Sequence, residues 1–415
     1  MKLIDVEKRT TTDHVRLVGR VAPRPHGHAV VPWAINEREF ANTPDGSGEI
    51  YFEFPRHYEN FVSESADPFA IALLLPSMAA GEPLEIGPRI SSSLLFQLAF
   101  IRDVWNTWYP KFHKTKIVAT ARDEPPPPRA PRAATFFSGG VDSFYTLLKR
   151  RDHDPLPVAL SHLIFMHGVE RSLEDSQGVE SSQRRVEQLA RAAGVETIVG
   201  KTNLRTVFPL HWEKYYFGSV LAATAVALSK GLGYVCIPSS FTYHHQVPHG
   251  STPLLDDRFS TESVQIVHDG GEASRATKTQ RIVEWDAPLV LSNLRVCIHN
   301  NGGDFNCGKC YKCVRTAIAL KAIGVWDSAA TFPDKSTDHW RRTVLADHPV
   351  LTFENLELAR KSGLDDELVR QLERIVRRVN RYDAIAAYSR NSPLERLLPI
   401  YRRAREITGG SPRMH

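Results

Sequence analysis

The sequence predicts an α/β protein whose main sheet is parallel, with further segments before and after it. The first observation is that short apolar runs alternate with longer amphipathic segments through the middle of the chain. This order is typical of a parallel sheet with helices on both faces. The second is a proline-rich break that separates this region from a first part of different composition. The third is the length of 415 residues, which exceeds one ordinary hydrophobic core and favours two or three domains.

Residues 1–123 predict an α+β accessory domain of their own. Runs of alternating polarity at Val15–Val21 and Glu49–Phe54 indicate strands, and Lys116–Ala119 indicates another. The apolar stretch Leu94–Trp108 indicates a helix. We therefore expect a small mixed domain before the main sheet.

A proline-rich segment, residues 124–131, follows and reads EPPPPRAP. Consecutive prolines favour polyproline II and can continue neither a helix nor an internal strand. We interpret the segment as a stiff linker rather than as a ligand for a proline-binding domain. The core domain, residues 132–325, begins directly after it.

Strands and helices alternate through the core domain. Strands are expected at Ala133–Phe137, His162–Met166, Thr197–Val199, Tyr234–Pro238, Val264–His268 and Leu294–Cys297. Helices are expected in the amphipathic stretch that ends at Arg151 and at Ser176–Ala193, Tyr216–Lys230 and Glu272–Trp285.

The C-terminal region, residues 326–415, is polar and predicted to be helical. Apolar residues recur there at helical spacing, namely Leu368, Leu372, Ile375, Val376 and Val379. A basic stripe runs between them, formed by Arg374, Arg377, Arg378 and Arg381. We interpret the stripe as a solvated helix face; the alternative is a contact with an acidic ligand or with nucleic acid.

The composition excludes several classes of protein. The apolar fraction of 42% and the charged fraction of 24% are those of a soluble globular protein. No apolar run reaches the ~18 residues that a membrane span needs, and Met1–Thr12 lacks the apolar segment of a signal peptide. The expected location is the cytoplasm, without a membrane partner. A net charge of +5 is modest and does not by itself imply a polyanionic partner.

The strongest local signal is the hexapeptide SGGVDS, which lies between an expected strand and an expected helix. A loop that turns from strand into helix directs backbone N–H groups toward an anion at the positive end of the helix dipole. Gly139 and Gly140 let the backbone approach phosphate closely, and the hydroxyls of Ser138 and Ser143 add donors. Asp142 can hold Mg²⁺. The pattern is neither a Walker A loop nor the Rossmann glycine pattern.

This hexapeptide resembles the signature of the PP-loop (N-type) ATP pyrophosphatases, among them GMP synthetase, NAD synthetase and asparagine synthetase. The resemblance implies a doubly wound five-stranded sheet, adenine nucleotide alpha hydrolase-like, and transfer of AMP from ATP to a substrate oxygen. It also implies contacts to ATP phosphates and Mg²⁺ by the loop residues and contacts to adenine at the end of the second strand. The loop residues are Ser138, Gly139, Gly140, Val141, Asp142 and Ser143, and the adenine residues are Met166 and His167.

Four of the five cysteines form one cluster with the spacing C-x9-C-x2-C-x2-C. They are Cys297, Cys307, Cys310 and Cys313. Four thiolates satisfy tetrahedral Zn²⁺ and leave no open position, so we expect a structural zinc site. An iron–sulfur cluster is the alternative, because the same ligand set suits it. The fifth cysteine, Cys236, lies in an apolar strand and is interpreted as a buried thiol.

The order of the two motifs, with Val-Arg-Thr after the last cysteine, resembles the 7-cyano-7-deazaguanine synthase family over Ala133–Leu320. Members of that family convert a carboxylate to an amide and then to a nitrile with ammonia and ATP. They lack the two terminal regions of this chain, and Ser239–His245 differs from their substrate loop. We therefore expect the same chemistry on a divergent substrate.

Two further segments are expected to border the site. The first, Ser239–Glu262, follows a strand end and is interpreted as a substrate loop, with His245 or His249 as a general base. A set of metal ligands formed by its three histidines is the alternative. Its polar residues are His244, His245, His249, Asp256, Asp257, Ser260 and Glu262. In the second, Arg275 and Lys278 lie one helical turn apart. Asp142, Ser143 and Lys278 are the expected catalytic residues, and Lys278 and Arg275 could neutralise the charge of phosphate or of the adenylate. That both cations are simply solvated is an equally weighted alternative.

The function expected from these motifs is an AMP- and pyrophosphate-forming ligase. It would adenylate a carboxylate or a carbonyl oxygen and let ammonia or an amine displace AMP, with ATP, Mg²⁺ and Zn²⁺ as cofactors. One alternative is a tRNA-modifying enzyme. Another is an ATP-binding subunit of a multi-protein system, for example a defence system. The terminal regions would contact the protein or tRNA partner, and a homodimer is common among such enzymes.

Overall fold

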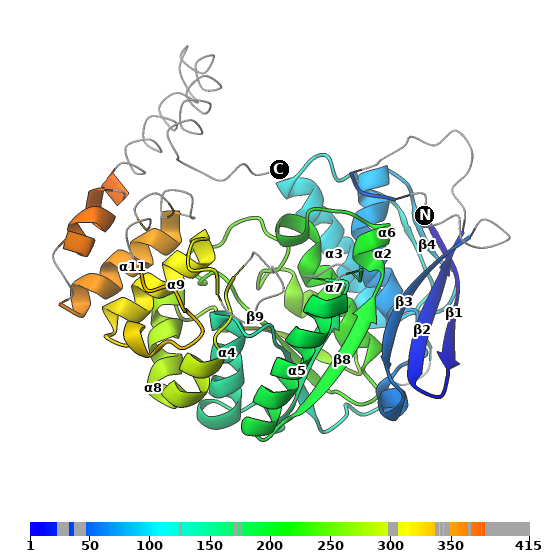
Figure 1. Ribbon diagram of the computed structural model, residues 1–415. Coiled ribbons are helices and arrows are strands. Elements are labelled where there is room, and N and C mark those ends of the chain that lie inside the picture. The colour runs from blue at the N-terminus through cyan, green and yellow to red at the C-terminus, as the bar shows by residue number, and fades with distance from the viewer. Residues whose placement is uncertain are drawn as a thin grey trace, which may run out of the picture. The chain divides into compact units, whose positions relative to one another are not determined.

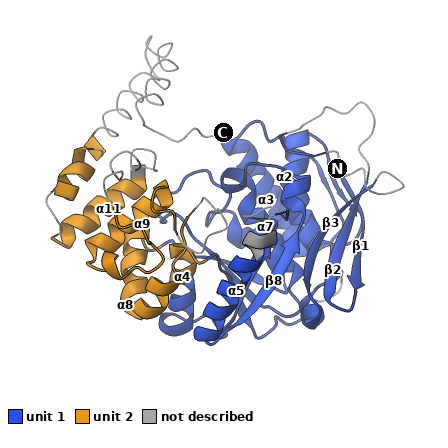
Figure 2. Cartoon of the chain, in the orientation of Figure 1, with its two compact units in different colours: residues 1–138, 146–271 blue, residues 139–145, 272–415 orange. Residues whose placement is uncertain are grey.

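The computed structural model describes the larger part of the chain. The described residues are 1–22, 33–36, 47–123, 127–169, 173–174, 176–297, 306–336, 340, 343, 349–363, 367–374 and 376–377. The chain divides into two compact units (Figure 2). The first unit comprises Met1–Ser138 and Thr146–Gly271, and the second comprises Gly139–Tyr145 and Glu272–His415. These bounds differ from the expected domain bounds, which remain a prediction.

The first unit is built on one ten-stranded sheet in the order β10-β9-β6-β7-β8-β3-β2-β1-β4-β5 (Figure 1). Five neighbouring strands in it are parallel, and they are β10 (Gln265–Asp269), β9 (Tyr234–Pro238), β6 (Ala133–Phe136), β7 (Leu160–His167) and β8 (Glu196–Thr202). Their carboxyl ends therefore lie along one edge of the sheet. All five match strands that the sequence predicts.

The other half of the sheet comes from the first 123 residues. Its strands are β1 (Lys2–Thr10), β2 (His14–Val21), β3 (Gly48–Pro55), β4 (Leu84–Ile86) and β5 (Ile117–Val118). The strand β3 pairs antiparallel with β8, Phe52 opposite Thr202 and Glu53 opposite Lys201. The expectation of a five-stranded sheet is thus wrong, because β8 does not end the sheet but carries β3 on its outer edge.

The helices of the first unit include two that are buried almost completely. They are α2 (Asp67–Ala80) and α7 (Phe217–Ala227), and the hydroxyl of Tyr216 at the start of α7 donates to the carbonyl of Ala72 in α2 at 2.7 Å. The remaining elements are α3 (Ser92–Trp108), α5 (Ser176–Ala192), α6 (Leu204–Val207), η1 (Arg56–Phe61), η2 (Lys149–His153), η3 (Trp212–Tyr216) and η4 (Asp256–Phe259). One hydrophobic core extends from Leu3 to Ile266 and includes both halves of the sheet.

The second unit is helical in its described part. After α4 (Val141–Leu148), whose first residues belong to it, the unit contains α8 (Arg275–Asn293), α9 (Tyr311–Ala322), η5 (Trp326–Ser328) and α11 (Pro349–Lys361). The prediction of a strand at Leu294–Cys297 is wrong. The backbone N–H groups of Val296 and Cys297 donate to the side chain of Asn306, at 2.8 and 3.1 Å, and not to a neighbouring strand.

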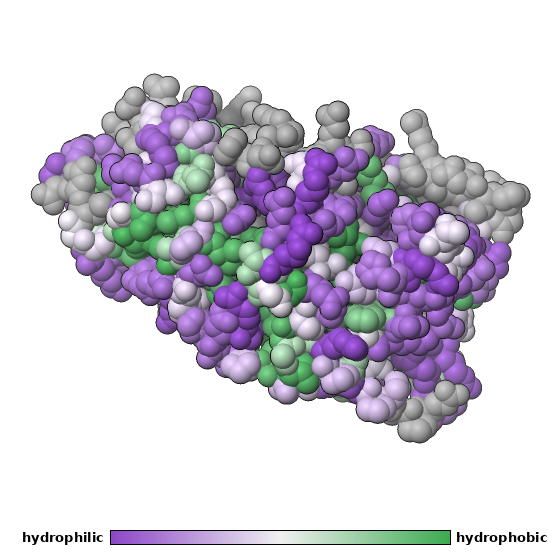
Figure 3. Space-filling view, turned by 60° about the horizontal axis from the view of Figure 1, so that its bottom comes forward, coloured by the Kyte–Doolittle hydropathy of each residue, from purple (hydrophilic) through white to green (hydrophobic). Residues whose placement is uncertain are grey.

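The surface is mixed in polarity. Figure 3 shows polar residues over much of the visible face, with apolar residues gathered in patches between them. Within the described ranges, none of the helices combines the length and the apolarity that crossing a bilayer requires.

Candidate functional site

The loop between β6 and α4 has the local geometry expected of an anion-binding turn. Gly139 adopts a φ of 82°, a conformation that residues with a Cβ rarely adopt, so a glycine is required there. The helix α4 begins at Val141, and the amide of Phe144 donates to the carbonyl of Gly140 at 3.0 Å. The hydroxyl of Ser143 donates to the same carbonyl at 2.9 Å. These bonds fix the start of α4, whose first amides lack partners within the helix.

Asp142 meets two cations from the first turn of α8. The guanidinium of Arg275 forms an ion pair with Asp142, and Nζ of Lys278 lies 3.5 Å from Oδ1 of the same carboxylate. Lys278 is only 1% exposed, and burying an ammonium group is costly unless an anion compensates it. One carboxylate thus faces two cations within the second unit. The structure therefore brings together Asp142 and Lys278, which the sequence singled out, with Arg275.

Glu354 of α11 joins this group, although no sequence motif marks it. Its carboxylate accepts the backbone N–H of Arg275 at 2.9 Å, and the residue is buried. Burial raises the pKa of Glu354, while the N–H and the charge of Arg275 and the charges of Arg315 and Lys278 oppose that rise. The neighbouring Asn355 donates to the carbonyl of Arg315 at 3.0 Å. The helix α11 thus contacts both the start of α8 and the buried Arg315 of α9.

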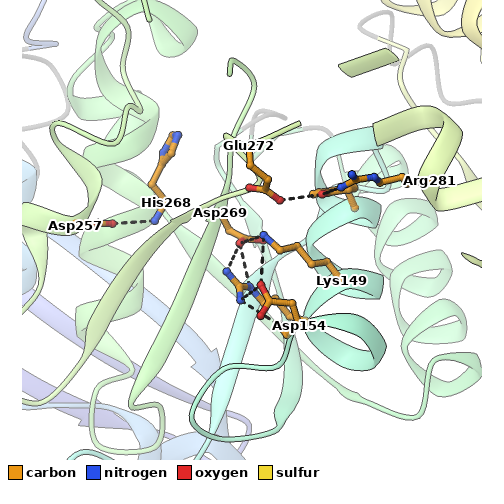
Figure 4. Close-up of polar contacts among 9 residues, drawn as sticks. Lys149, Asp154, Asp257, His268, Asp269, Glu272 and Arg281 are labelled. Atoms are coloured by element: carbon orange, nitrogen blue, oxygen red, sulfur yellow. Dashed lines mark hydrogen bonds and ion pairs between the residues drawn. The ribbon is translucent and has the colours of Figure 1, made fainter. Parts of the chain in front are cut away.

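A second polar contact fixes α4 against α8 within the second unit. The hydroxyl of Tyr145 donates to Glu272 at 2.8 Å and accepts from Arg281 at 2.9 Å. The ring of Trp285 stacks on Tyr145 with centroids 5.3 Å apart. Burial, followed by the carboxylate of Glu272, raises the pKa of Tyr145, so the phenol stays protonated. Figure 4 shows Glu272 and Arg281 on this contact.

Met166 and His167 lie at the carboxyl end of β7, in the first unit. Both are buried, and Gly168 follows with a φ of 80°. A Cβ on Gly168 would collide with the carbonyl of Thr202 in β8. The chain therefore needs a glycine to leave the sheet here. The expected adenine contact of these two residues stays a prediction.

Asp269, at the end of β10, is the centre of a cluster of ion pairs. Its carboxylate is 1% exposed and lies 3.3 Å from Nζ of Lys149 and 2.6 Å from Nη2 of Arg150. Figure 4 shows Lys149 and Asp154 gathered beside it. Nearby, Cys236 is fully buried, as the sequence predicts, and burial raises the pKa of its thiol.

Two of the three histidines of the expected substrate loop, His244 and His245, have ring centroids 4.6 Å apart. His245 lies beside Thr242, His249 packs between the rings of Phe217 and Phe241, and Asp256 instead pairs with a histidine of β10. Throughout the described ranges, only the four cysteines form a group of metal-binding side chains close enough for one ion. A histidine metal site is therefore not supported there.

The four-cysteine cluster fits a tetrahedral metal. The four sulfur atoms lie within 4.8 Å of one another, and those of Cys307 and Cys313 are 3.8 Å apart. Zinc–sulfur bonds of ~2.3 Å place the sulfurs of a tetrahedron about 3.8 Å apart. The amides of Lys309 and Cys310 donate to the sulfur of Cys307 at 3.4 and 3.3 Å, around Gly308 with a φ of 70°. The donor set and its turn are those of a closed structural site.

The buried thiols also need a cation for electrostatic reasons. A hydrogen bond with Cys310, burial and the charges of the other sulfurs raise the pKa of Cys313 far above its usual value. Four thiolates can coexist in this volume only if a cation compensates them. Cys297 enters the cluster because Asn306 holds its backbone, so Asn306 is a second residue that the sequence alone did not mark.

Replacing Asn306 with leucine is expected to destabilise the second unit and to loosen the metal site. The side chain is 2% exposed and bonds the amides of Val296 and Cys297 and the carbonyls of Leu294 and Thr331. We expect the free energy of unfolding to fall by about 2–4 kcal/mol, because each buried group left without a partner costs ~1–3 kcal/mol. Urea unfolding with zinc analysis measures both effects. Asn306→Asp keeps the acceptor and should lose less; an unchanged leucine variant would contradict this account.

Comparison with known proteins gives one partial relative. No family model and no solved structure matches the chain. A stretch of 111 residues is 31% identical to 7-cyano-7-deazaguanine synthase of Methanosarcina mazei, which amounts to 25% of this chain and 46% of that protein. The chain thus spans about half the length of the curated relative that it matches. The match supports a relationship to that protein within this stretch.

Proposed function

We propose that this protein is a PP-loop enzyme that adenylates a substrate carboxylate with ATP, releases pyrophosphate, and lets ammonia or an amine displace AMP. Support comes from the strand–loop–helix geometry at Ser138–Ser143 and from the similarity to 7-cyano-7-deazaguanine synthase. The observation that carries the proposal is the group formed by Asp142, Arg275 and Lys278. The two cations at the start of α8 and the amides at the N-terminus of α4 suit the pyrophosphate portion of ATP.

Each residue of this group has a definable task in the proposed reaction. Lys278 and Arg275 would bind the β- and γ-phosphates and stabilise the charge that develops on pyrophosphate as the α-phosphorus is attacked. Asp142 fits Mg²⁺, which takes one or two carboxylates and keeps several waters. When bound, Mg²⁺ would neutralise phosphate charge. Glu354 binds the backbone at the start of α8 and would thereby keep Arg275 and Lys278 in position.

The remaining parts would serve binding and stability. Zn²⁺ on Cys297, Cys307, Cys310 and Cys313 would hold the region between α8 and α9, since four thiolates leave no position for a substrate. Met166 and His167 would contact adenine. The regions outside the core domain, residues 1–123 and 326–415, would bind a substrate that is larger than 7-carboxy-7-deazaguanine or different from it.

Incubation with ATP, Mg²⁺ and ammonia is expected to yield AMP and pyrophosphate in a carboxylate-dependent manner. The carboxylates would be a panel that includes 7-carboxy-7-deazaguanine, and mass spectrometry would identify the amide or nitrile product. ADP and phosphate would contradict the mechanism. Lack of turnover with the whole panel would reject a small carboxylate as the substrate.

A further inference from the structure

A buried pair joins Asp256, a residue of the expected substrate loop, to His268, a strand residue that the sequence did not single out. Nδ1 of His268 in β10 is 2.7 Å from Oδ2 of Asp256 in η4, and their side chains are 3% and 0% exposed. The hydroxyl of Ser251 donates to the same oxygen of Asp256 at 2.5 Å. The backbone N–H of His268 donates to Asp257 at 2.9 Å, which Figure 4 shows. All four residues belong to the first unit, and together they hold the imidazole in one orientation.

This arrangement sets the tautomer of His268. A carboxylate only accepts hydrogen bonds, so the proton of the neutral imidazole resides on Nδ1 and points at Asp256. Nε2 then carries the lone pair. Nε2 is buried, and no hydrogen-bond partner for it exists among the described residues. A buried acceptor without a partner is costly and calls for an explanation, of which catalysis is one.

The position of His268 in the fold points to a ligand. His268 is the penultimate residue of β10, which runs parallel to β9, and β9 runs parallel to β6. The carboxyl ends of these strands therefore share one edge, at which Ser138 follows β6. Open α/β sheets bind their ligands at this edge. The ring of Tyr243, 53% exposed, lies 6.4 Å from the imidazole.

We propose that His268 is the general base of the second half-reaction, an inference that rests on the proposed function. Ammonia forms a bond from nitrogen to the acyl carbon of the adenylate, and Nε2 of His268 takes a proton from that nitrogen. The bond between the acyl carbon and the phosphate oxygen breaks, and AMP leaves with its electron pair. Asp256 stabilises the imidazolium that results, as the acidic member of a catalytic triad does. The imidazolium then returns the proton to water.

Measuring the two half-reactions separately distinguishes a general base at His268 from a residue that only maintains the fold. Formation of the adenylate releases pyrophosphate and needs no nitrogen, so exchange of labelled pyrophosphate into ATP reports the first half-reaction alone. Formation of the amide requires both half-reactions. Loss of a general base slows only the second half-reaction, whereas a misfolded site loses both half-reactions together.

The test uses the full chain and its His268→Gln variant with 7-carboxy-7-deazaguanine, or with another carboxylate of the panel that supports exchange. We expect pyrophosphate exchange within about twofold of the parent. Amide formation with ammonia should fall at least ~100-fold, the scale of general-base catalysis. Hydroxylamine, largely unprotonated at neutral pH and strongly nucleophilic, should restore product formation because it needs little help from a base. Asp256→Asn should show the same pattern more weakly.

His162→Gln is the matched control, because His162 is a histidine of the same unit with a side chain that is also 3% exposed. It lies toward the amino end of β7 and should leave both half-reactions unchanged. Equal loss of exchange and amide formation in His268→Gln, or no rescue by hydroxylamine, would overturn the base role while the proposed function stands. Absence of exchange in the parent chain would reject the proposed function, and the role of His268 with it.

Discussion

Replacing Asp142 with alanine is expected to lower pyrophosphate release by about 100–1000-fold, the usual scale for removing one preorganised electrostatic contact. Asp142 is the carboxylate that Arg275 and Lys278 share, and it is the Mg²⁺ ligand of the proposed mechanism. Without it, a lysine that is 1% exposed loses a compensating charge, and the metal loses its protein ligand. Quantification of AMP and pyrophosphate under saturating ATP measures the effect.

Loss of stability is the competing explanation, because removing one member of a buried ion pair costs about 3–5 kcal/mol. Urea unfolding of the same Asp142→Ala variant separates the two causes. Pyrophosphate release should stay about 100–1000-fold lower even at a temperature at which the variant is fully folded. Activity that returns to the parent's level under such conditions would show that Asp142 acts through folding alone.

Replacing Cys307 with serine is expected to abolish stoichiometric metal binding and to unfold the region from α8 to α11. A structural zinc site contributes about 10–16 kcal/mol of apparent binding free energy in small zinc peptides, so part of a unit of this size depends on it. Elemental analysis of the parent should find about one zinc per chain. The variant should lose zinc, helical circular dichroism and resistance to proteolysis within the second unit.

Cys236→Ala is the control, since Cys236 is the cysteine outside the cluster and lies buried in β9 of the first unit. It should keep its metal. If the purified parent chain is brown, absorbs visible light and contains iron, the four cysteines hold an iron–sulfur cluster instead of zinc. A parent chain without bound metal, whose Cys307→Ser variant unfolds like the parent, would contradict a structural metal site.

Local signals were sufficient where neighbours in sequence are neighbours in space. The loop at Ser138–Ser143, the strand Tyr234–Pro238 and the cysteine cluster each depend on residues close together in the chain, and the sequence predicted all three. The helix α2 was missed because it is apolar on every side, so it lacks the amphipathic period that marks a surface helix.

Long-range partners were the part that the sequence could not supply. Two residue pairs join β3 to β8, across about 150 positions of chain, and nothing in either strand specifies the other. Glu354 reaches the backbone of Arg275 across 79 positions. His268 was read as an ordinary strand residue, because its acidic partner Asp256 lies on a separate turn. Such pairs become visible only when tertiary contacts are known.

The contact between α2 and α7 has a consequence for folding of the chain during its synthesis. Ala72 leaves the ribosome long before Tyr216, which is 144 positions later, and until then the side of this apolar helix that α7 covers lacks its partner. At ~5–20 residues per second the wait lasts on the order of ten seconds or more. Nascent chains should therefore recruit chaperones over this interval. A fragment that ends before α7 should aggregate rather than fold, however complete its own strands are.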